Sequence, residues 1–230
     1  MTKFYGIGVG PGDPELLTLK AVKALKSSDF IFEATSHTNT TSIAGSIVKN
    51  FIKEKAIFIP LVFPMLKNKK IMKSAWKKNA EIIAEKIFSG HICSFVTIGD
   101  PLLYSTCSYL ISELKKIIPS DQIEIIPGIS TIQICSAKTL TPLAEGDEAI
   151  SIFPILSRKR ISKIEDSKCK NIVIMKSYKN KNSIANFAKK YNYKVIYASK
   201  LCLKDEKISS DIQEIKNMPI EYLSIFILKK

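Results

Sequence analysis

Apolar runs and helical periods alternate over the first 130 residues of the chain. Short continuous apolar runs predict buried strands, and segments with apolar residues three or four positions apart predict helices. The predicted strands cover 3–9, 29–34, 56–61, 91–98 and 123–126, and the predicted helices between them cover 18–27, 42–51, 68–88 and 103–117. In the first helix we expect Leu19, Val22 and Leu25 on the buried face. Such alternation predicts a largely parallel sheet flanked by helices.

The second half of the chain has a different pattern of predicted elements. An irregular stretch at 141–148 follows a predicted helix over 131–140. Further strands are predicted at 150–153, 171–176 and 195–199, near Lys207 and at 222–228, with a helix at 183–191. The last two strands lie too close in sequence for a crossover helix, so we expect them to pair antiparallel. The sequence thus predicts two α/β domains, 1–119 and 120–230, with a mainly parallel N-terminal sheet, a mixed C-terminal sheet and a cleft between them.

The composition is that of a globular protein, since 46% of the 230 residues are hydrophobic. The net charge of +14 comes almost wholly from lysine, because Arg158 and Arg160 are the only arginines. Lysine is a point charge without the planar fork of arginine. A lysine-rich solvated surface and attraction to a polyanionic partner both remain open.

Several classes of protein are disfavoured. The five cysteines are odd in number, widely spaced and without a CxxC or HExxH pattern, which predicts reduced core residues and no metal site. The N-terminus lacks a basic region followed by an apolar stretch, and prolines interrupt the longest apolar run, so we expect a cytoplasmic protein with no membrane segment. Aromatic residues such as Phe30 and Phe58 lie within apolar strands, which leaves a basic nucleic-acid-binding module as a remote alternative.

Glycine-bearing segments follow three of the predicted strands: GVGPGDPELLT at 8–18, GDPLLYST at 99–106 and PGIST at 127–131. The first matches neither GxGxxG, whose third glycine is replaced by Pro11 or Asp13, nor GxxxxGK[ST]. Each segment alone is compatible with an ordinary strand-to-helix turn. Because ligands bind at the carboxyl ends of parallel strands, three such segments together predict a binding site.

In this order, GVGPGDPELLT, GDPLLYST, IIPGIS and TPLAEGDE resemble the tetrapyrrole methylases, and the resemblance spans nearly the whole chain. Within the family, GDPLLYST and PLAEGDE are most similar to enzymes that methylate carbon C20 of precorrin-2 or of its cobalt-bearing counterpart, cobalt-factor II. The resemblance implies methyl transfer from S-adenosylmethionine, leaving S-adenosylhomocysteine, in corrin ring synthesis. It also implies a homodimer whose N-terminal domain holds the tetrapyrrole and whose C-terminal domain holds the cofactor. Methylation of another carbon of a related tetrapyrrole is the alternative.

Carried over position by position, the resemblance assigns contact residues. The residues expected to contact the cofactor are Pro11, Ile98, Gly99, Asp100, Leu103, Ser130, Thr131, Met175 and Ala198. Those expected to contact the tetrapyrrole are Gly10, Gly12, Asp13, Tyr104, Ser105, Glu145 and Asp147. The several carboxylates of precorrin-2 would supply the polyanionic partner that the lysine excess allows.

The chemistry implied by the resemblance needs orientation more than covalent help. A sulfonium methyl is electrophilic and a meso carbon is nucleophilic, and holding the two in line is worth about 7–11 kcal/mol. A proton must then leave C20, which a basic group can accept. Asp100 is the first candidate, with helix capping as the open alternative. Lys176 would bind a carboxylate or assist deprotonation, and Tyr104 would contact the ring. The lysine-rich, arginine-poor composition favours the cobalt form of the substrate.

Overall fold

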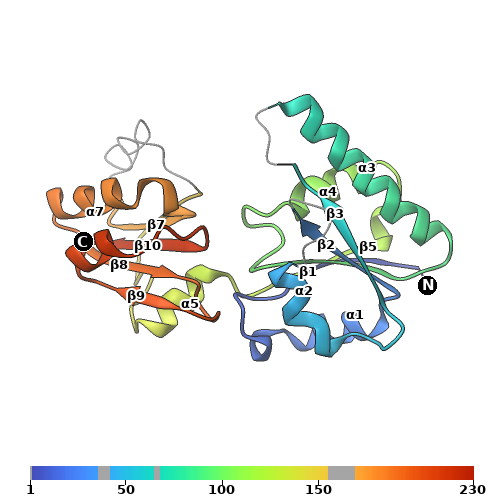
Figure 1. Cartoon of the computed structure of the whole chain (residues 1–230), viewed down its shortest axis with the longest axis horizontal. Coiled ribbons are helices and arrows are strands. Elements are labelled where there is room, and N and C mark those ends of the chain that lie inside the picture. The colour runs from blue at the N-terminus through green and yellow to red at the C-terminus, as the bar shows by residue number, and fades with distance from the viewer. Residues whose placement is uncertain (1, 36–41, 65–67, 155–168) are drawn as a thin grey trace. The chain divides into compact units, whose positions relative to one another are not determined.

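The computed structural model describes residues 2–35, 42–64, 68–154 and 169–230. The chain forms two compact units, Met1–Ser130 and Thr131–Lys230, each with its own sheet (Figure 1). The strand at 123–126 pairs within the first sheet, so the first unit extends beyond residue 119, the end of the predicted N-terminal domain. No helix in the described ranges is long and apolar enough to span a membrane.

The first unit contains a parallel sheet, as the alternating pattern predicts. Its strands are β1 (Phe4–Gly8), β2 (Phe30–Thr35), β3 (Ile57–Val62), β4 (Cys93–Thr97) and β5 (Ile123–Ile126), in the order β3-β2-β4-β1-β5. Every pairing between them is parallel. Gly8 lies opposite Thr97, and Ile7 lies opposite Ile126. Strands β1, β4 and β5 therefore end at one edge of the sheet, which we call the carboxyl edge.

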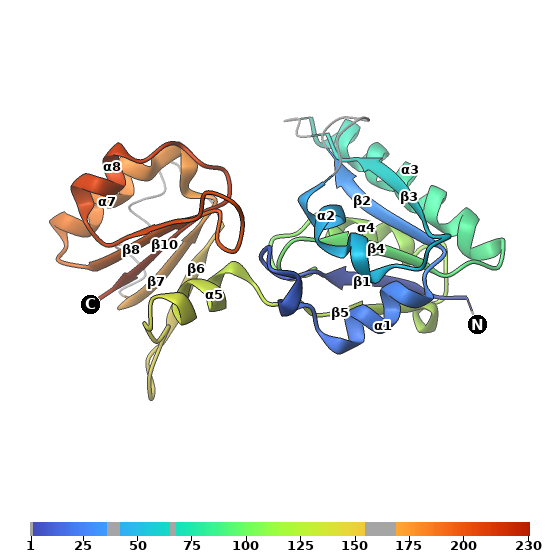
Figure 2. The ribbon, with the colours of Figure 1, turned by 60° about the horizontal axis from the view of Figure 1, so that its bottom comes forward.

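Helices cover both faces of this sheet, α1 on one side and α3 on the other (Figure 2). The elements are η1 (Pro14–Leu16), α1 (Leu19–Ser27), α2 (Ile43–Val48), η2 (Lys49–Phe51), α3 (Lys69–Phe88), α4 (Cys107–Leu114) and η3 (Ser120–Gln122). Thr18 caps α1, since its Oγ1 accepts a hydrogen bond from the Ala21 N–H at 3.1 Å. Phe32 and Phe95 pack under α3 and α4, whereas Ile7 and Ile31 pack under α1 and α2. The four predicted helices are thereby confirmed.

Two details of the predicted helices are wrong. Leu19 is 82% exposed, and the buried face of α1 consists of Ala21, Ala24 and Leu25. Leu19 is the first residue of the helix. Helix α4 begins at Cys107 rather than at 103, because Tyr104 has a φ of 51°, which a right-handed helix cannot accommodate.

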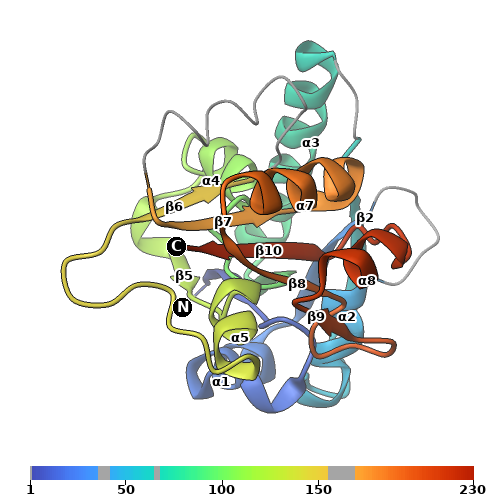
Figure 3. The ribbon, with the colours of Figure 1, turned by 90° about the vertical axis from the view of Figure 1, so that its left-hand side faces the viewer.

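The second unit contains the mixed sheet that the sequence predicts. Its strands are β6 (Ile150–Phe153), β7 (Asn171–Met175), β8 (Lys194–Ser199), β9 (Lys207–Ser209) and β10 (Ser224–Lys229), in the order β6-β7-β10-β8-β9 (Figure 3). Strands β6 and β7 are parallel, and the other pairings are antiparallel. The helices of this unit are α5 (Thr131–Lys138), η5 (Ser177–Asn180), α7 (Lys181–Lys190) and α8 (Ile212–Asn217).

The predicted pairing of the last two strands with each other is wrong. Strand β8 lies between β9 and β10 and pairs antiparallel with both. The connection from β9 to β10 contains the short helix α8, which is capped by Asp211, whose Oδ1 accepts from the Glu214 N–H at 2.7 Å. Ile215 of α8 is fully buried in the core under α7. Ile212 and Met218 pack against the same core, so packing and the cap together hold a helix in a connection that looked too short for it.

Candidate functional site

The three glycine segments meet at the carboxyl edge of the first sheet. The Val9 N–H donates to the Thr97 carbonyl at 2.9 Å, and the Gly99 N–H donates to the Gly10 carbonyl at 2.8 Å. A Cβ on Gly8 would lie only 2.5 Å from the Gly99 oxygen and 2.6 Å from the Gly128 nitrogen. The backbones of all three segments thus pack directly against one another, which only glycine permits here. The three segments therefore form one surface, which we call the glycine surface.

This surface depends on backbone conformations that favour glycine. Gly10 has a φ of 76° and Gly99 a φ of 70°, both in the left-handed region. Pro11, between Gly10 and Gly12, is buried, and Asp13 is half-buried and caps η1, with Oδ1 accepting from the Glu15 N–H at 2.9 Å. The backbone is therefore the part of this loop that can approach a ligand most closely.

Asp100 ties two of the segments together. Its Oδ1 accepts from the Leu102 N–H at 2.8 Å, and its Oδ2 accepts from the Gly128 N–H at 3.3 Å. Both carboxylate oxygens therefore accept from the backbone. Asp100 is not a helix cap as the alternative expected, because α4 begins at Cys107 and its N-cap is Thr106; it holds the turn that follows it and the loop after β5 instead. Its role as a base remains a prediction.

The segment after Asp100 presents side chains to solvent. Leu102 is 58% exposed and Tyr104 is 43% exposed, the latter from a left-handed backbone that a side chain rarely adopts. The Ser105 hydroxyl lies 3.1 Å from Thr97 Oγ1 and accepts from the Cys107 N–H at 3.2 Å, so it supports the start of α4. Ile98 and Leu103 are half-buried. An apolar strip therefore adjoins the glycine surface, and nothing in the sequence pattern indicates the exposure of Leu102.

Ser130 belongs to the same surface. It is buried, and its Cα lies 3.8 Å from the position of a Cβ built on Gly99. Thr131 follows it as the first residue of α5 and of the second unit. The predicted cofactor contacts of the first unit, from Pro11 to Ser130, therefore lie on one edge of one sheet. Gly8 and Gly128 were not predicted as contacts, although a glycine directly after Pro127 is a signal of close packing.

The predicted cofactor residues of the second unit also share one face. Met175 and Ala198 both lie opposite Ile225, one on each side of β10. The alternate residues Ile174 and Tyr197 fill the core under α7 and α8, so Met175 and Ala198 belong to the other face. Helix α5, which begins at Thr131, packs against β10 on the side away from α7 (Figure 2). Thr131, Met175 and Ala198 are thus assembled on the α5 face.

Lys176 and Lys200 follow the ends of β7 and β8. Each has a φ of 51°, a left-handed conformation that is uncommon outside glycine. Burial lowers the pKa of the Lys176 ammonium from its ordinary value. The Lys200 ammonium lies 3.0 Å from the Glu221 carboxylate. Lys176, directly after Met175, is therefore a partly desolvated cation at the end of a strand.

Glu148, which the sequence analysis did not single out, holds the acidic loop of the second unit, residues 145–148. Glu148 Oε2 accepts from the Glu145 N–H at 3.2 Å and from Asn171 Nδ2 at 2.9 Å. The hydrogen bond from Asn171 lowers the pKa of the Glu148 carboxyl. Glu145 and Asp147 are exposed, and Lys229 Nζ lies 4.0 Å from the Glu145 carboxylate. Glu148 anchors the loop to β7, leaving the two predicted contacts at its surface. No cluster of His, Cys, Asp and Glu suited to a metal occurs among the described residues.

The chain is similar to known proteins over its whole length. The family model for tetrapyrrole (corrin/porphyrin) methylases matches residues 3–216. A probable cobalt-precorrin-2 C(20)-methyltransferase of Methanocaldococcus jannaschii is 36% identical over 230 residues, which is 99% of this chain and 96% of the relative.

Solved structures show the same fold at low sequence identity. A cobalt precorrin-4 methyltransferase has a TM-score of 0.74 at 20% identity, covering 99% of this chain and 94% of that one. A uroporphyrin-III C-methyl transferase from Thermus thermophilus, complexed with S-adenyl homocysteine, has a TM-score of 0.67 at 16% identity, covering 99% and 97%. With the glycine surface, the two sheets and the family match in agreement, the chain belongs to the tetrapyrrole (corrin/porphyrin) methylases.

Proposed function

We propose that this protein transfers a methyl group from S-adenosylmethionine to carbon C20 of precorrin-2 in its cobalt-bearing form, during corrin ring synthesis. The observation that carries the proposal is the 36% identity, over 99% of the chain, to the relative named a probable cobalt-precorrin-2 C(20)-methyltransferase. A homodimer in the cytoplasm is part of the same proposal.

The residues at the predicted contact positions are suited to binding S-adenosylmethionine. The glycine surface around Gly10 and Gly99 exposes backbone without side chains, which suits close approach of a ligand to peptide groups. In the second unit, Met175, Ala198 and Thr131 share one face, and because Ala198 is fully buried it would bind through its backbone. S-adenosylmethionine supplies the electrophilic methyl group, and these residues would bind and orient it.

The tetrapyrrole would lie against the exposed side of the carboxyl edge. Leu102 and Tyr104 offer apolar surface to a flat macrocycle, and Tyr104 is held there by an unusual backbone conformation. Gly10, Gly12 and Asp13 would form the adjoining trough. Glu145 and Asp147, on the acidic loop, are the proposed contacts from the second unit.

The proposed roles of Asp100 and Lys176 differ. Asp100 holds the loops after β4 and β5 through both carboxylate oxygens, so the geometry supports a positioning role. Lys176 combines a left-handed backbone with a pKa lowered by burial. In its charged form it would bind a substrate carboxylate, and in its neutral form it would accept a proton.

The test is a methyl-transfer assay read by mass spectrometry. The purified protein is given S-adenosylmethionine with a labelled methyl carbon, and cobalt-precorrin-2 or metal-free precorrin-2 in separate reactions. A single added methyl, placed at C20 by carbon NMR, on the cobalt substrate is the expected result. Addition at another carbon would replace the C20 assignment, and addition only to metal-free precorrin-2 would overturn the cobalt preference. No methyl on either substrate, with cofactor binding intact by calorimetry, would refute the proposed reaction.

A further inference from the structure

Helix α3 extends past the carboxyl edge of the first sheet. Asn79 lies ten residues after Lys69, the first residue of α3. Its Nδ2 donates a hydrogen bond to the carbonyl of Val62, the last residue of β3, at 3.0 Å. Because α3 runs antiparallel to the strand before it, residues 69–78 continue beyond the strand end. At 1.5 Å per residue this overhang measures about 15 Å. Figure 1 shows α3 projecting beyond the strands.

The overhang is fixed to the neighbouring helix by an aromatic stack. The rings of Trp76 on α3 and Tyr109 on α4 lie 4.2 Å apart and 4° from parallel. Trp76 is seven residues after the start of α3, and Tyr109 is two residues after the start of α4. The stack therefore joins the N-terminal half of α3 to the first turn of α4, which follows the Tyr104 segment.

The tip of the overhang carries concentrated positive charge. Lys69, Lys70 and Lys73, which we call the lysine rim, are all exposed, and none of them forms an ion pair with any described residue. In contrast, Lys77 lies 3.7 Å from the carboxylate of Glu81. Residues 69–78 include five lysines and no acidic residue.

This arrangement opposes the local preferences of a helix. Lys69 and Lys73, and Lys73 and Lys77, are like charges four residues apart, which destabilise a helix. Lys69 and Lys70 place positive charge in the first turn, where the helix dipole favours negative charge. Conflicts of this kind concentrate at functional positions.

We propose that the lysine rim binds carboxylates of the tetrapyrrole as it enters the carboxyl edge, and so determines the preference for carboxylate-rich substrates. The inference rests on the proposed function, because it takes the tetrapyrrole as the ligand. Its basis is a helix that overhangs the carboxyl edge and is joined to α4 by the aromatic stack, together with three cations without a carboxylate partner in the described part of the chain. Flexible lysine stems suit carboxylates that differ in position around a ring.

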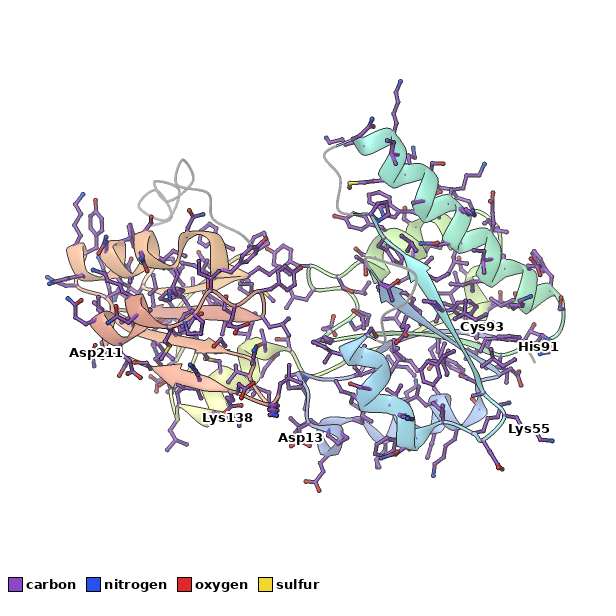
Figure 4. All side chains as sticks on the ribbon, in the orientation of Figure 1. Asp13, Lys55, His91, Cys93, Lys138 and Asp211 are labelled. Carbon is purple, nitrogen blue, oxygen red and sulfur yellow. The ribbon has the colours of Figure 1, made fainter. Side chains whose placement is uncertain are left out.

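The experiment compares two triple variants with equal loss of charge. One replaces Lys69, Lys70 and Lys73 by Gln. The control replaces Lys26, Lys49 and Lys55 by Gln; these are exposed, and Lys55 lies at the opposite end of the first unit from Asp13 (Figure 4). We expect the KM for the tetrapyrrole to rise about tenfold in the rim variant, with kcat and the KM for S-adenosylmethionine unchanged, and to stay within twofold in the control.

Two further measurements distinguish binding by charge at the lysine rim from a general effect of the substitutions on folding. The wild-type KM for the tetrapyrrole should rise with ionic strength more steeply than that of the rim variant, and a Lys→Arg rim variant should keep the wild-type KM. The inference would be overturned by equal KM values for the tetrapyrrole in the rim variant and wild type, or by equal increases of that KM in the rim and control variants. Either result would leave the proposed function standing, provided that the wild type turns over. Failure of wild-type turnover with both tetrapyrroles would instead refute the proposed function itself.

Discussion

The hydrogen bonds of Asp100 make its replacement the most informative change at the site. Removing the carboxylate in Asp100→Ala leaves the Leu102 and Gly128 N–H groups without their acceptor. Hydrogen bonds to a charged group contribute about 1.5–3 kcal/mol each, and the second bond is long at 3.3 Å. We therefore expect Asp100→Ala to lower the free energy of unfolding by about 2–4 kcal/mol.

Asp100→Asn is the matched variant. An Asn side chain keeps one oxygen, which can accept from the Leu102 N–H, but turns an NH₂ group toward the Gly128 N–H. We expect about half the loss of stability seen in the alanine variant, together with weaker binding of S-adenosylmethionine, because the loops after β4 and β5 are no longer joined.

Denaturant unfolding and calorimetry measure these two effects, and the pH dependence of kcat separates them from proton transfer. If Asp100 acts by positioning, stability and cofactor affinity fall together and the shape of the pH profile is kept. The reasoning is refuted if both variants unfold like wild type and bind the cofactor normally, while kcat falls by orders of magnitude and its acidic limb disappears.

Three other outcomes are expected elsewhere in the molecule. Gly8→Ala should lower the free energy of unfolding by about 1–3 kcal/mol and abolish cofactor binding, because the new Cβ meets backbone atoms. Gly6→Ala should have a smaller effect on both quantities, because its Cβ meets the tip of a side chain. Thermal unfolding measures the first quantity and calorimetry the second. Hydrogen bonding to Lys53 holds the pKa of Asp29 below its ordinary value of 3.8. The ionised carboxylate therefore stabilises the folded protein above that pH, and this contribution is lost as the pH falls through the lower pKa of the folded state. The free energies of unfolding of wild type and Asp29→Asn should differ at neutral pH and converge in acid. Burial raises the pKa of the Cys107 thiol to about 12, so iodoacetamide should label it only on unfolding, and labelling of the native protein detected by mass spectrometry would contradict this.

The architecture was predictable where a local pattern reports on burial. Strands of a parallel sheet are covered on both faces, so β1, β2 and β4 are mostly apolar, with Glu33 in β2 and Ser94 in β4 as interruptions, and helical periods separate them. The strand order β3-β2-β4-β1-β5 was not predictable in the same way, because it depends on contacts between distant segments. For the same reason α8 was missed, since its stability comes from burying Ile215 against residues far away in the sequence.

In the candidate site, features that depend on backbone conformation were predictable from the sequence, whereas features that depend on side-chain contacts were not. Gly8, Gly10 and Gly99 are visible in the sequence because close backbone packing or a left-handed φ favours glycine. Asp100 was visible as a residue type, but its contact with Gly128, 28 positions away, was not. The exposure of Leu102 and the overhang of the lysine rim leave no local signature, because exposed positions tolerate many residues. A sequence therefore reports close backbone packing at the carboxyl edge more clearly than the exposed side chains that we propose to select one tetrapyrrole over another.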